Sequence, residues 1–571
     1  MDSTAAALEQ PRSQASVAPA ADGLLPIVIG VTGHRHLREA DLPTLRARVR
    51  ELFETLRRRY PATPLRIITA LAAGADRLVA EVALEDGHDL LVPLPLEPRD
   101  YERDFPQSAA QFHALLERLR PDQVFVLPQH DGTPEHSEAQ AQRDERYRAA
   151  GLFIAERCHV LLALWDGRPS ASDAGTAAVV RFKLEGTVDR LEAGLRAFDA
   201  DDSGPVYHVH TPRAGDSTGA AGRARWLHPR QDEQATFDSL CQRIDQFNSE
   251  PLRRTLSPRL PEALAGLLPD IDSQPVPERT LATCFATADL LARHYQRLTR
   301  WVLRLTLVFA ALLALVFELY AEVLPWRGLP AGYLALFASL TGILLWQSRR
   351  DVQSRYLDYR ALAEGLRVQF YWRVSGLPDN ASGSYLRKQL DELRWIREAL
   401  RGAASLAHPG QSQPELALRY WIGGQAAYYA ERAHSQRKRL HAFERRSQAF
   451  MIGGLAAAAA LVTFWSQLGA PHSPWHDWLV VLMGFAPIGA ALWETYAERL
   501  GLRSQVNQYA RFAGIFQRAG RFAQRLERIS EPRERQRGLI ALLRELGHEA
   551  LMENGDWVLL LRERPLVLPK G

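Results

Sequence analysis

The residues best suited to chemistry in this 571-residue chain lie in four short turns of its first third. Each turn follows a short apolar segment, at 26–32, 65–69, 90–94 or 160–165; the third turn is Pro93–Pro95, and the other three combine glycine with threonine, aspartate or arginine. Glycine lets a backbone approach a phosphate closely, and a helix that begins there offers unpaired N–H groups to an anion. The candidates are Gly30, Thr32, Gly33, His34 and Arg35; Gly74, Ala75, Asp76 and Arg77; Asp166 and Gly167; and Asp173, Gly175 and Thr176.

These residue types suit a nucleotide or another phosphorylated ligand. The hydroxyls of Thr32 and Thr176 can donate to phosphate, and Arg35 can add a charge-assisted contact. Asp76 or Asp166 can accept from ribose hydroxyls, whereas His34 fits a turn residue as well as a ligand contact. One such turn is ordinary turn chemistry, but four of them at one sheet edge predict a binding site.

The elements expected around these turns form an α/β Rossmann-like domain with a parallel sheet. Short apolar runs of strand type alternate with helical periodicity, which is typical of a sheet covered on both faces. Ligands of such sheets lie beyond the carboxyl ends of the strands. The expected strands are 26–32, 65–69, 90–94, 124–127, 160–165 and 205–210, with helices at 42–60, 77–84, 139–156 and 176–185.

Several of these motifs recur in the order found in a known superfamily. Over about residues 24–215 the chain resembles the SLOG domain of the Smf/DprA–LOG Rossmann-like superfamily, whose members bind nucleotides or nucleotide-derived signals. LOG phosphoribohydrolases carry a catalytic glutamate after their glycine–threonine pair, where this chain has Val179. The resemblance therefore implies binding without a catalytic residue. It rests on Gly30–Arg35, Leu71–Ala80, Pro93–Pro95 with Tyr101 and Asp104–Phe105, Leu164–Gly167, and Gly175–Thr176.

The rest of the chain divides by composition. Residues 1–24 predict a disordered tail, and 25–215 form the nucleotide-binding domain. Residues 216–279 contain three parts. The first is the end of a flexible Gly/Ser/Arg-rich loop that begins at Pro212, the second is a helix at 232–248, and the third is a proline-rich linker over 251–277. Two helical units, 280–400 and 401–571, complete the chain.

Each helical unit contains a hairpin of apolar segments. The four segments, at about 303–324, 329–347, 450–468 and 478–494, come close to the roughly 20 residues that cross a bilayer. Ten of the thirteen tryptophans lie between Trp301 and Trp493, several at the segment ends, as in an interfacial belt. The alternative is a pair of hairpins buried in a large soluble bundle.

The distribution of basic residues predicts an orientation. Basic residues precede the first apolar segment and follow the second one in each hairpin. The loops that join the two segments contain a single basic residue of this kind, Arg327. Under the positive-inside rule both hairpins dip outward from a bacterial inner membrane, with the N-terminal domain and the C-terminus in the cytoplasm. Cys158, Cys241 and Cys284 form no ligand pair, which fits a reducing compartment and predicts no metal site.

The two hairpins also resemble each other and a known class of membrane module. Tyr359–Ala363 and Tyr509–Ala513 follow the hairpins 150 residues apart and indicate an internal repeat. The region is similar to the SLATT class of two-span effectors, which accompany SLOG sensors in bacterial conflict systems and are proposed to perturb membranes or form pores. The supporting segments are Ala288–Ala292, Tyr359–Arg367 with Trp372, Glu553–Asn554 with Trp557, and Arg562–Pro565.

Acidic residues near the spans are candidates for a pore. Glu318 and Glu322 share one helical face near the end of the first span, and Glu494 and Glu498 repeat that spacing after the fourth. Either pair suits a cation-favouring vestibule, and either also suits ordinary helix ends in the headgroup zone. Four short spans predict a homo-oligomer if the segment conducts.

Taken together, these patterns predict a membrane-anchored nucleotide sensor that triggers a pore-forming or membrane-perturbing effector, with a role in anti-phage defence implied by the resemblances. One alternative is a membrane-tethered nucleotide-processing enzyme with Asp76, Asp166 or Asp173 as acid or base. A signalling anchor without transport is another. The net charge of only +4 argues against nucleic-acid binding.

Overall fold

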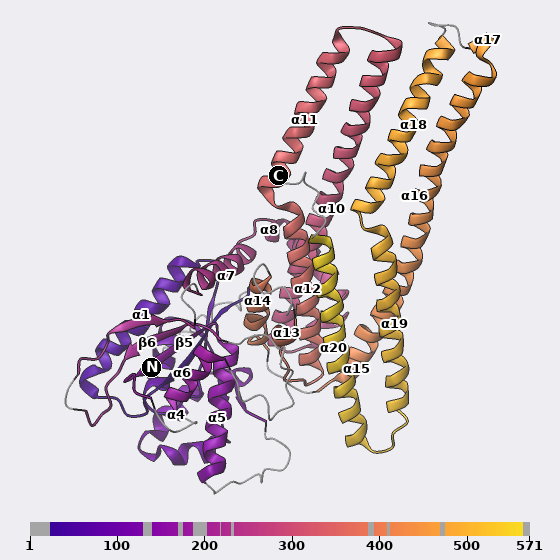
Figure 1. Ribbon diagram of the computed structural model, residues 1–571. Helices are drawn as coiled ribbons and strands as arrows, with labels where there is room; N and C mark the ends of the chain where they lie inside the picture. The colour runs from indigo at the N-terminus through magenta and orange to yellow at the C-terminus, as the bar shows by residue number, and fades with distance from the viewer. Residues whose placement is uncertain are drawn as a thin grey trace, which may run out of the picture.

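Figure 1 shows an α/β domain attached to the lower part of a body of long helices. The structure is a computed structural model of the chain. It describes residues 23–128, 140–169, 175–186, 203–216, 219–229, 233–385, 393–407, 412–468 and 474–562. The tail predicted for residues 1–24 falls almost wholly outside these ranges.

The N-terminal domain is built on a seven-stranded sheet, and the six predicted strands are confirmed. The strand order is β4-β3-β2-β1-β5-β6-β7, with all neighbours parallel except β6 and β7. The order reverses at β1, so a crevice opens between β1 and β5 at their carboxyl ends. The strands are β1 (Ile27–Gly33), β2 (Leu65–Ile68), β3 (Asp89–Leu94), β4 (Val124–Val126), β5 (Val160–Trp165), β6 (Val206–His210) and β7 (Ala224–Leu227).

Alternation along β1 assigns the two faces of the sheet to different helices. Ile27, Ile29 and Val31 pack in a core with residues of α1 (Leu42–Arg59) and α2 (Ala75–Glu85). Val28 packs on the opposite face, in a core with residues of α5 (Gln140–Arg157) and α6 (Thr176–Glu185). The short helices α3 (Pro98–Tyr101) and α4 (Ala109–Leu116) connect β3 to β4. The predicted three-layer arrangement is therefore present.

Two predicted irregular regions are ordered. The loop predicted over 212–229 contains β7, which pairs antiparallel with β6 and extends the sheet beyond residue 215. The proline-rich linker over 251–277 contains α8 (Leu252–Leu256), α9 (Leu260–Ala265) and the start of the next helix, with Leu267 and Ile271 buried in the helical core. Several of the prolines precede or open helices and 3-10 turns, where their missing N–H costs little.

The helical body repeats one arrangement of three helices. A long helix, a shorter apolar helix and a polar helix follow one another twice, with lengths of 43, 23 and 23 residues and then 40, 26 and 25 residues. A left-handed backbone residue separates the second and third helix each time, Asp351 and then Gly501, so the breaks are 501 − 351 = 150 residues apart. The helices are α10 (Val276–Glu318), α11 (Gly328–Arg350) and α12 (Val352–Val374), then α16 (Gly424–Thr463), α18 (Pro474–Arg499) and α19 (Leu502–Leu526).

Shorter helices complete the body close to the α/β domain. A core that includes Trp372, Trp421 and Phe516 joins the lower parts of the long helices. The remaining elements are α7 (Glu233–Asn248), α13 (Ala381–Ser384), α14 (Arg394–Ala404), α15 (Pro414–Leu416), α17 (Trp465–Leu468) and α20 (Pro532–Arg562).

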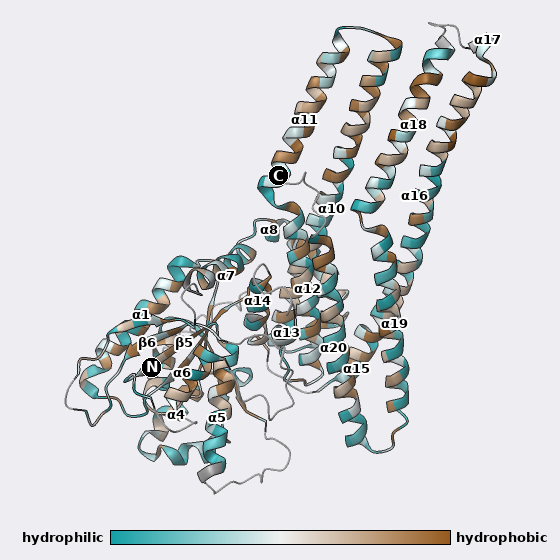
Figure 2. Cartoon of the chain, in the orientation of Figure 1, coloured by the Kyte–Doolittle hydropathy of each residue, from teal (hydrophilic) through white to brown (hydrophobic). Residues whose placement is uncertain are grey.

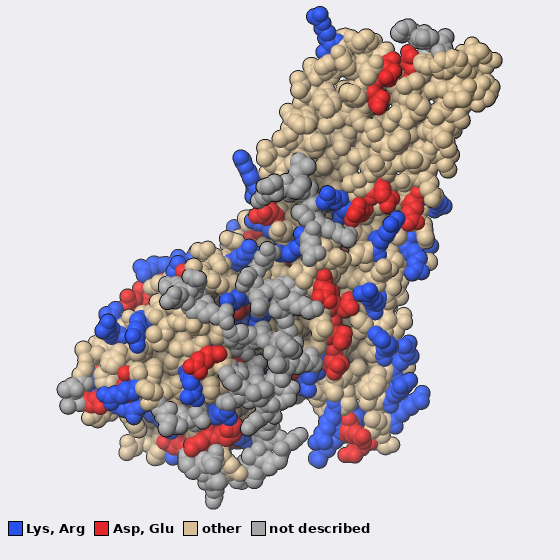
Figure 3. Space-filling view, in the orientation of Figure 1, with Lys and Arg blue, Asp and Glu red and all other residues tan. Residues whose placement is uncertain are grey.

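Three helical stretches are long and apolar enough to cross a membrane: Val276–Val323, Gly328–Val374 and Trp475–Leu526. Hydrophobic residues cover the ends of α10, α11 and α18 that point away from the α/β domain, and Figure 3 shows few charged side chains over that region (Figures 2 and 3). None of the apolar window in Gly328–Val374 is buried, and Leu334 is 68% exposed. A soluble bundle would cover such side chains, so the chain has the character of a membrane protein.

The sequence predicted four such segments, and the segment at 450–468 is not among the three. The helix α16 ends at Thr463, inside the predicted segment, and Arg445 and Arg446 precede its apolar part. Small residues instead let α16 pack closely on α18, because a Cβ on Gly454 would lie 2.8 Å from the Cβ of Ala486.

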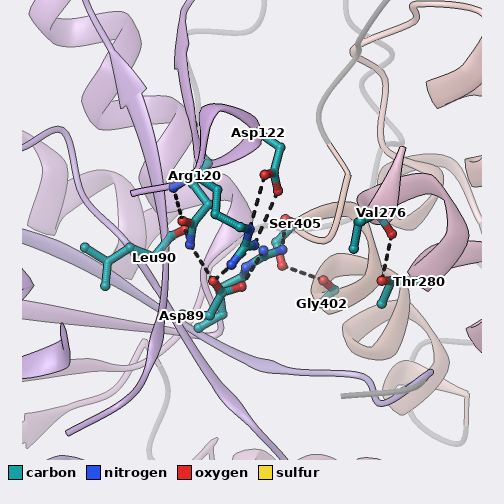
Figure 4. Close-up of polar contacts among 10 residues, drawn as sticks. Asp89, Leu90, Arg120, Asp122, Val276, Thr280, Gly402 and Ser405 are labelled. Carbon is teal, nitrogen blue, oxygen red and sulfur yellow. Dashed lines mark hydrogen bonds and ion pairs between the residues drawn. The ribbon is translucent and has the colours of Figure 1, made fainter. Parts of the chain in front are cut away.

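Polar contacts fix the amino ends of the strands to the helical body (Figure 4). Arg66 of β2 donates to the carbonyl of Ser405 and pairs with Asp89 of β3 at 2.5 Å. Asp89 also accepts from Gln123 at 2.5 Å, and Ser405 donates to the carbonyl of Gly402 at 2.6 Å. The contact between the two parts of the chain is therefore a hydrogen-bonded seam.

A buried histidine makes a second link across this seam. His159 Nδ1 accepts from the N–H of Val28 at 2.8 Å, and its Nε2 lies 2.8 Å from the carbonyl of Glu398 in α14. Burial lowers the pKa of His159 to about 4. The ring is therefore neutral, with its single proton on Nε2, and it joins β1, β5 and α14.

The seam predicts which glycine the fold requires. A Cβ on Gly402 would lie 2.5 Å from the carbonyl oxygen of Pro26, whereas a Cβ on Gly514 in α19 would meet nothing within 4 Å. We expect Gly402→Ala to lower the stability of the full chain by about 1–3 kcal/mol, since the overlap moves α14 away from β1. Gly514→Ala should stay within about 1 kcal/mol of the wild type. Thermal unfolding in detergent measures both, and equal midpoints would contradict the packing.

Candidate functional site

A cleft of about 630 Å³ lies at the carboxyl ends of β1 and β5. Such a volume is in the range of sites for small ligands. The cleft is the place where the sheet topology predicts a ligand. Its walls come from the turns after β1, β2 and β5, from α5, and from the start of α6. Predicted residues that line it are Thr32, Gly33, His34, Arg35, Asp76, Gly175 and Thr176, together with Tyr101 and Val179.

The start of α6 presents an open helix N-terminus to the cleft. Thr176 Oγ1 donates to the carbonyl of Gly33 at 3.0 Å, which holds the helix start beside β1. A Cβ on Gly175 would meet nothing within 4 Å among the described residues. The first N–H groups of a helix lack intrahelical acceptors and carry a partial positive charge. This end of the cleft suits an anion.

The opposite wall combines aromatic rings with a guanidinium. The Arg35 guanidinium lies over the Tyr147 ring, 4.8 Å from its centroid, and the Tyr147 and Tyr101 rings are 5.9 Å apart. The hydroxyls of Tyr101 and Tyr147 are buried without a hydrogen-bond partner in the described residues. Two unpaired hydroxyls and a cation beside flat rings suit a ligand with both a polar group and a ring.

Asp76 supplies the carboxyl group of the cleft. It begins the first turn of α2, is 6% exposed, and accepts from Thr69 Oγ1 at 3.1 Å. Burial raises the pKa of Asp76 to about 7, although the hydrogen bond from Thr69 and the nearby Arg35 and Arg77 oppose that rise. The group therefore changes charge near neutral pH and can accept or donate a hydrogen bond to a ligand.

Four predicted site residues support the turns by packing instead. Gly30 is not among the residues that line the cleft, and a Cβ on it would lie 2.7 Å from Cγ2 of Ile154 in α5. Gly74 has φ +81°, and a Cβ there would lie 2.4 Å from the carbonyl oxygen of His34. That same carbonyl accepts from the N–H of Ala75 at 3.0 Å. Gly33 lines the cleft through its backbone, yet a Cβ would lie 2.4 Å from that of Ala75.

Arg77 is also structural. Its guanidinium is fully buried over the Phe105 ring, 4.1 Å from the centroid. It donates to the carbonyl of Leu71 at 3.0 Å and to the carbonyl of Ser108 at 2.7 Å. These contacts fix the turn after β2 against the segment that carries Tyr101, and this is the structural role of Arg77.

Asp166 positions other groups of the cleft. It accepts from Arg213 Nε at 2.8 Å and from the N–H of Arg168 at 3.1 Å. Burial opposes its ionisation, but these two donors outweigh that effect and keep the pKa of Asp166 below its usual range. His34 Nε2 accepts from the Asp166 N–H at 3.0 Å, and Gly167 has φ +81° in the same turn. The predicted Asp173 lies outside the described residues.

The lining residues that the sequence did not single out include Asp144, Tyr147 and Arg213. Tyr147 stands alone among charged residues in the polar helix predicted at 139–156, and an aromatic residue in that setting is the signal that was available. Arg213 lies in the stretch predicted to be a flexible loop. Val179 packs on Gly151, where a Cβ would lie 2.5 Å from the Cγ2 of Val179.

The acidic residues predicted for a pore fall in different surroundings. Glu318 ends α10 against α18, with a carboxylate oxygen 2.7 Å from where a Cβ on Gly484 would lie. Glu322 is exposed in the π-helical turn Leu319–Val323. Glu494 pairs with Arg503 at 3.3 Å at the other end of α18. Glu494 is thus an ion-paired helix-end residue, and only Glu318 lies between helices of the apolar region.

Comparison with known protein families gives a match for one part of the chain. A family model described as a protein of unknown function, DUF4231, matches residues 285–373. That range begins within α10, includes all of α11 and ends one residue before the end of α12, so it covers most of one three-helix arrangement. No match was found among curated proteins or among solved structures.

The raised pKa of Asp76 predicts a pH dependence of stability. The folded chain holds the proton on Asp76 more tightly than the unfolded chain does, so stability falls as pH rises from about 4 to about 7. Asp76→Asn should not show this loss. Its free energy of unfolding, compared with that of the wild type, should therefore increase by up to about 4 kcal/mol between pH 4 and pH 8. The exposed Asp272→Asn is the control and should keep the wild-type slope. Parallel curves for Asp76→Asn and the wild type would exclude this role.

Proposed function

We propose that the chain is a membrane-anchored sensor whose cleft binds a nucleotide or nucleotide-derived signal, and whose helical body responds by perturbing or opening the membrane. The observation that carries the proposal is the cleft itself. Seven residues selected from the sequence for phosphate and ribose chemistry line a single cavity at the switch point of the sheet. The resemblances to SLOG and SLATT proteins support the same assignment.

The ligand chemistry follows from the two ends of the cleft. Phosphate would lie at the open start of α6, near Thr176 and the Thr32 hydroxyl. A base or sugar would lie against Tyr147 and Tyr101, with Asp76 within reach of its hydroxyls. Arg35 and Arg213 supply positive charge on either side.

The cleft and the seam lie at opposite ends of the sheet, so a signal must travel along the strands or the covering helices. Helix α5 is suited to this, because Tyr147 and Gly151 line the cleft while Arg157 at its end donates to the carbonyl of Pro378 at 3.0 Å. Helix α6 begins at the cleft and its buried Lys183 donates to the carbonyl of Cys158 at 2.7 Å, just after α5. Ligand that moves α5 and α6 would therefore move the contact with the helical body.

Binding alone changes nothing unless the ligand prefers one arrangement. A shift from a population of 1% to 99% needs a preference of about ten thousand-fold between the two arrangements. A cleft with unpaired hydroxyls and an open helix start has contacts to gain on closure. We infer that the closed cleft is the arrangement that favours the active membrane helices.

We further propose four membrane crossings with both hairpins entering from the cytoplasmic side of a bacterial inner membrane. Helix α18 starts at the end of the body distant from the α/β domain, so α16 must run that whole distance beside it (Figure 1). The basic residues at the inner ends of the hairpins support this orientation. The 150-residue spacing of Asp351 and Gly501 supports a duplicated unit, of which a homo-oligomer would supply several copies.

A second function is favoured by Asp76. A buried carboxyl group with a pKa of about 7 in the wall of a cleft has the property required of a general acid or base. A nucleotide bound there would then be hydrolysed at its N-glycosidic bond, and the chain would be a membrane-tethered enzyme. Val179 in the place of the LOG glutamate favours the sensor.

The cleft assignment predicts the effect of charge at the start of α6. Thr176→Asp places a carboxylate where the phosphate would lie, and the side chain still suits a helix start. A nucleotide panel that includes cyclic and ADP-ribose compounds should yield a ligand that stabilises the wild type by about 2.7 kcal/mol at 100-fold its Kd. This gain should vanish in Thr176→Asp.

Thr280→Asp is the matched control, because the Thr280 hydroxyl, like that of Thr176, donates to a backbone carbonyl. Its acceptor is Val276, one turn earlier in α10. It should bind like the wild type. Wild-type binding by Thr176→Asp would exclude phosphate at α6. Chromatography of the bound nucleotide separates the two functions, since a sensor returns it intact and an enzyme converts it.

The proposed path through α5 predicts a separation of binding from response. Arg157→Ala removes the contact with Pro378, so ligand should bind within about threefold of the wild-type Kd while ligand-triggered dye release from liposomes falls at least about tenfold. Arg58→Ala, on the exposed face of α1, should leave both unchanged. Normal release by Arg157→Ala would remove α5 from the path.

A further inference from the structure

A second large cavity lies in the helical body, apart from the cleft and at the base of the apolar helices. Its volume is about 640 Å³, and its walls come from α10, α12, α16, α18, α19 and α20. Leu303 lines it just before the apolar part of α10 begins, and Leu500 lines it just after α18 ends. In a membrane the cavity would lie at the depth of the lipid headgroups on the basic side.

The charge of this cavity is strongly positive. Eight arginines line it, with Asp289 as the one lining carboxylate. Asp289 pairs with Arg293 at 2.7 Å and lies 3.5 Å from Arg360. Arg367, which also lines the cavity, pairs with Glu364 at 2.7 Å. Carboxylates of the helical body therefore account for only part of the positive charge.

Arginines from two helices remain without a carboxylate partner among the described residues: Arg297 and Arg300 of α10, and Arg432 and Arg439 of α16. Arg300 contacts the side chain of Gln296, and Arg432 lies over the Tyr428 ring at 5.2 Å. Like charges converging on a cavity repel one another, so an anion between them would be stabilised by all four. Arginine is the residue that binds phosphate most directionally.

Unpaired neutral groups in the same walls refine the ligand. Within the part of the chain that the structure describes, Gln425 Oε1, Gln436 Oε1 and Thr299 Oγ1 are buried without a hydrogen-bond partner. An amide oxygen accepts hydrogen bonds and therefore cannot pair with an anion. It pairs with a hydroxyl. Buried polar atoms normally have partners, so these atoms point to a ligand that carries hydroxyls as well as phosphate.

We propose that this cavity binds a phosphate group attached to a hydroxyl-bearing head, with arginines of α10 and α16 on the phosphate and the glutamine oxygens on the hydroxyls. Two sources have this chemistry: the headgroup of an anionic lipid such as phosphatidylglycerol, and a soluble phosphorylated polyol or nucleotide. Because the ligand would bridge the two halves of the helical body, its presence would set how α10 and α16 lie relative to each other.

The test uses the full chain in detergent and compares two triple variants with equal loss of charge. The cavity variant is Arg297→Gln with Arg432→Gln and Arg439→Gln, three exposed side chains whose replacement disturbs no ion pair among the described residues. The control is Arg349→Gln with Arg350→Gln and Arg437→Gln, three exposed arginines outside the cavity. Melting temperatures without ligand, and the single variant Arg439→Gln, show whether each protein is folded.

Phosphatidylglycerol in mixed micelles, with phosphatidylcholine as the neutral lipid, tests the lipid source by thermal shift. Glycerol 3-phosphate and ADP without lipid test the soluble source. We expect at least about a tenfold weaker Kd in the cavity variant than in the control, and about threefold for Arg439→Gln. Loss confined to phosphatidylglycerol identifies a lipid, and loss confined to the soluble probes identifies a free phosphate. Equal affinity of both triple variants for every probe would overturn the proposal.

Discussion

The structure depends on a neutral imidazole buried between the sheet and the helical body. His159 at the start of β5 accepts a hydrogen bond from β1 and donates one to α14, and its burial lowers its pKa to about 4. A protonated ring could not accept from Val28, so the join needs the neutral form. Arg66 and Gly402 continue the same seam toward β2 and Pro26. The amino ends of the strands are consequently fixed to the helices.

This arrangement leaves the carboxyl ends of the strands free to hold a ligand. The cleft faces away from the seam, and the helices that line it, α5 and α6, run from the cleft toward the helical body. In the proposed function a small change at Tyr147 or Thr176 is therefore carried to the level of Arg157 by rigid helices. The basic cavity beneath the apolar helices lies farther along the same molecule. It offers a second place where a charged ligand bears on the arrangement of α10 and α16.

Much of the fold could be predicted from sequence, because buried parallel strands and amphipathic helices have strong local patterns. Six strands and the position of the cleft followed from such runs. β7 could not be predicted, since Ala224–Leu227 has no continuous apolar run and gains its order from β6. The roles of Gly33, Gly74 and Arg77 also depend on packing between distant segments. A glycine that accommodates Ala75 and one that approaches a phosphate look the same in a sequence. The fourth predicted apolar segment is not among the three candidate stretches, and α16 ends at Thr463 within that segment, a break that the apolar run itself does not indicate.

The central claim is that a ligand in the cleft alters the helical body through α5. Hydrogen–deuterium exchange of the full chain in detergent, with and without the nucleotide identified by the panel, tests it most directly. We expect slower exchange at residues 32–36 and 175–177, together with a change at 376–385, where Arg157 contacts the helical body. Protection at the cleft with no change at 376–385 would contradict coupling, and no protection at the cleft would contradict the site itself.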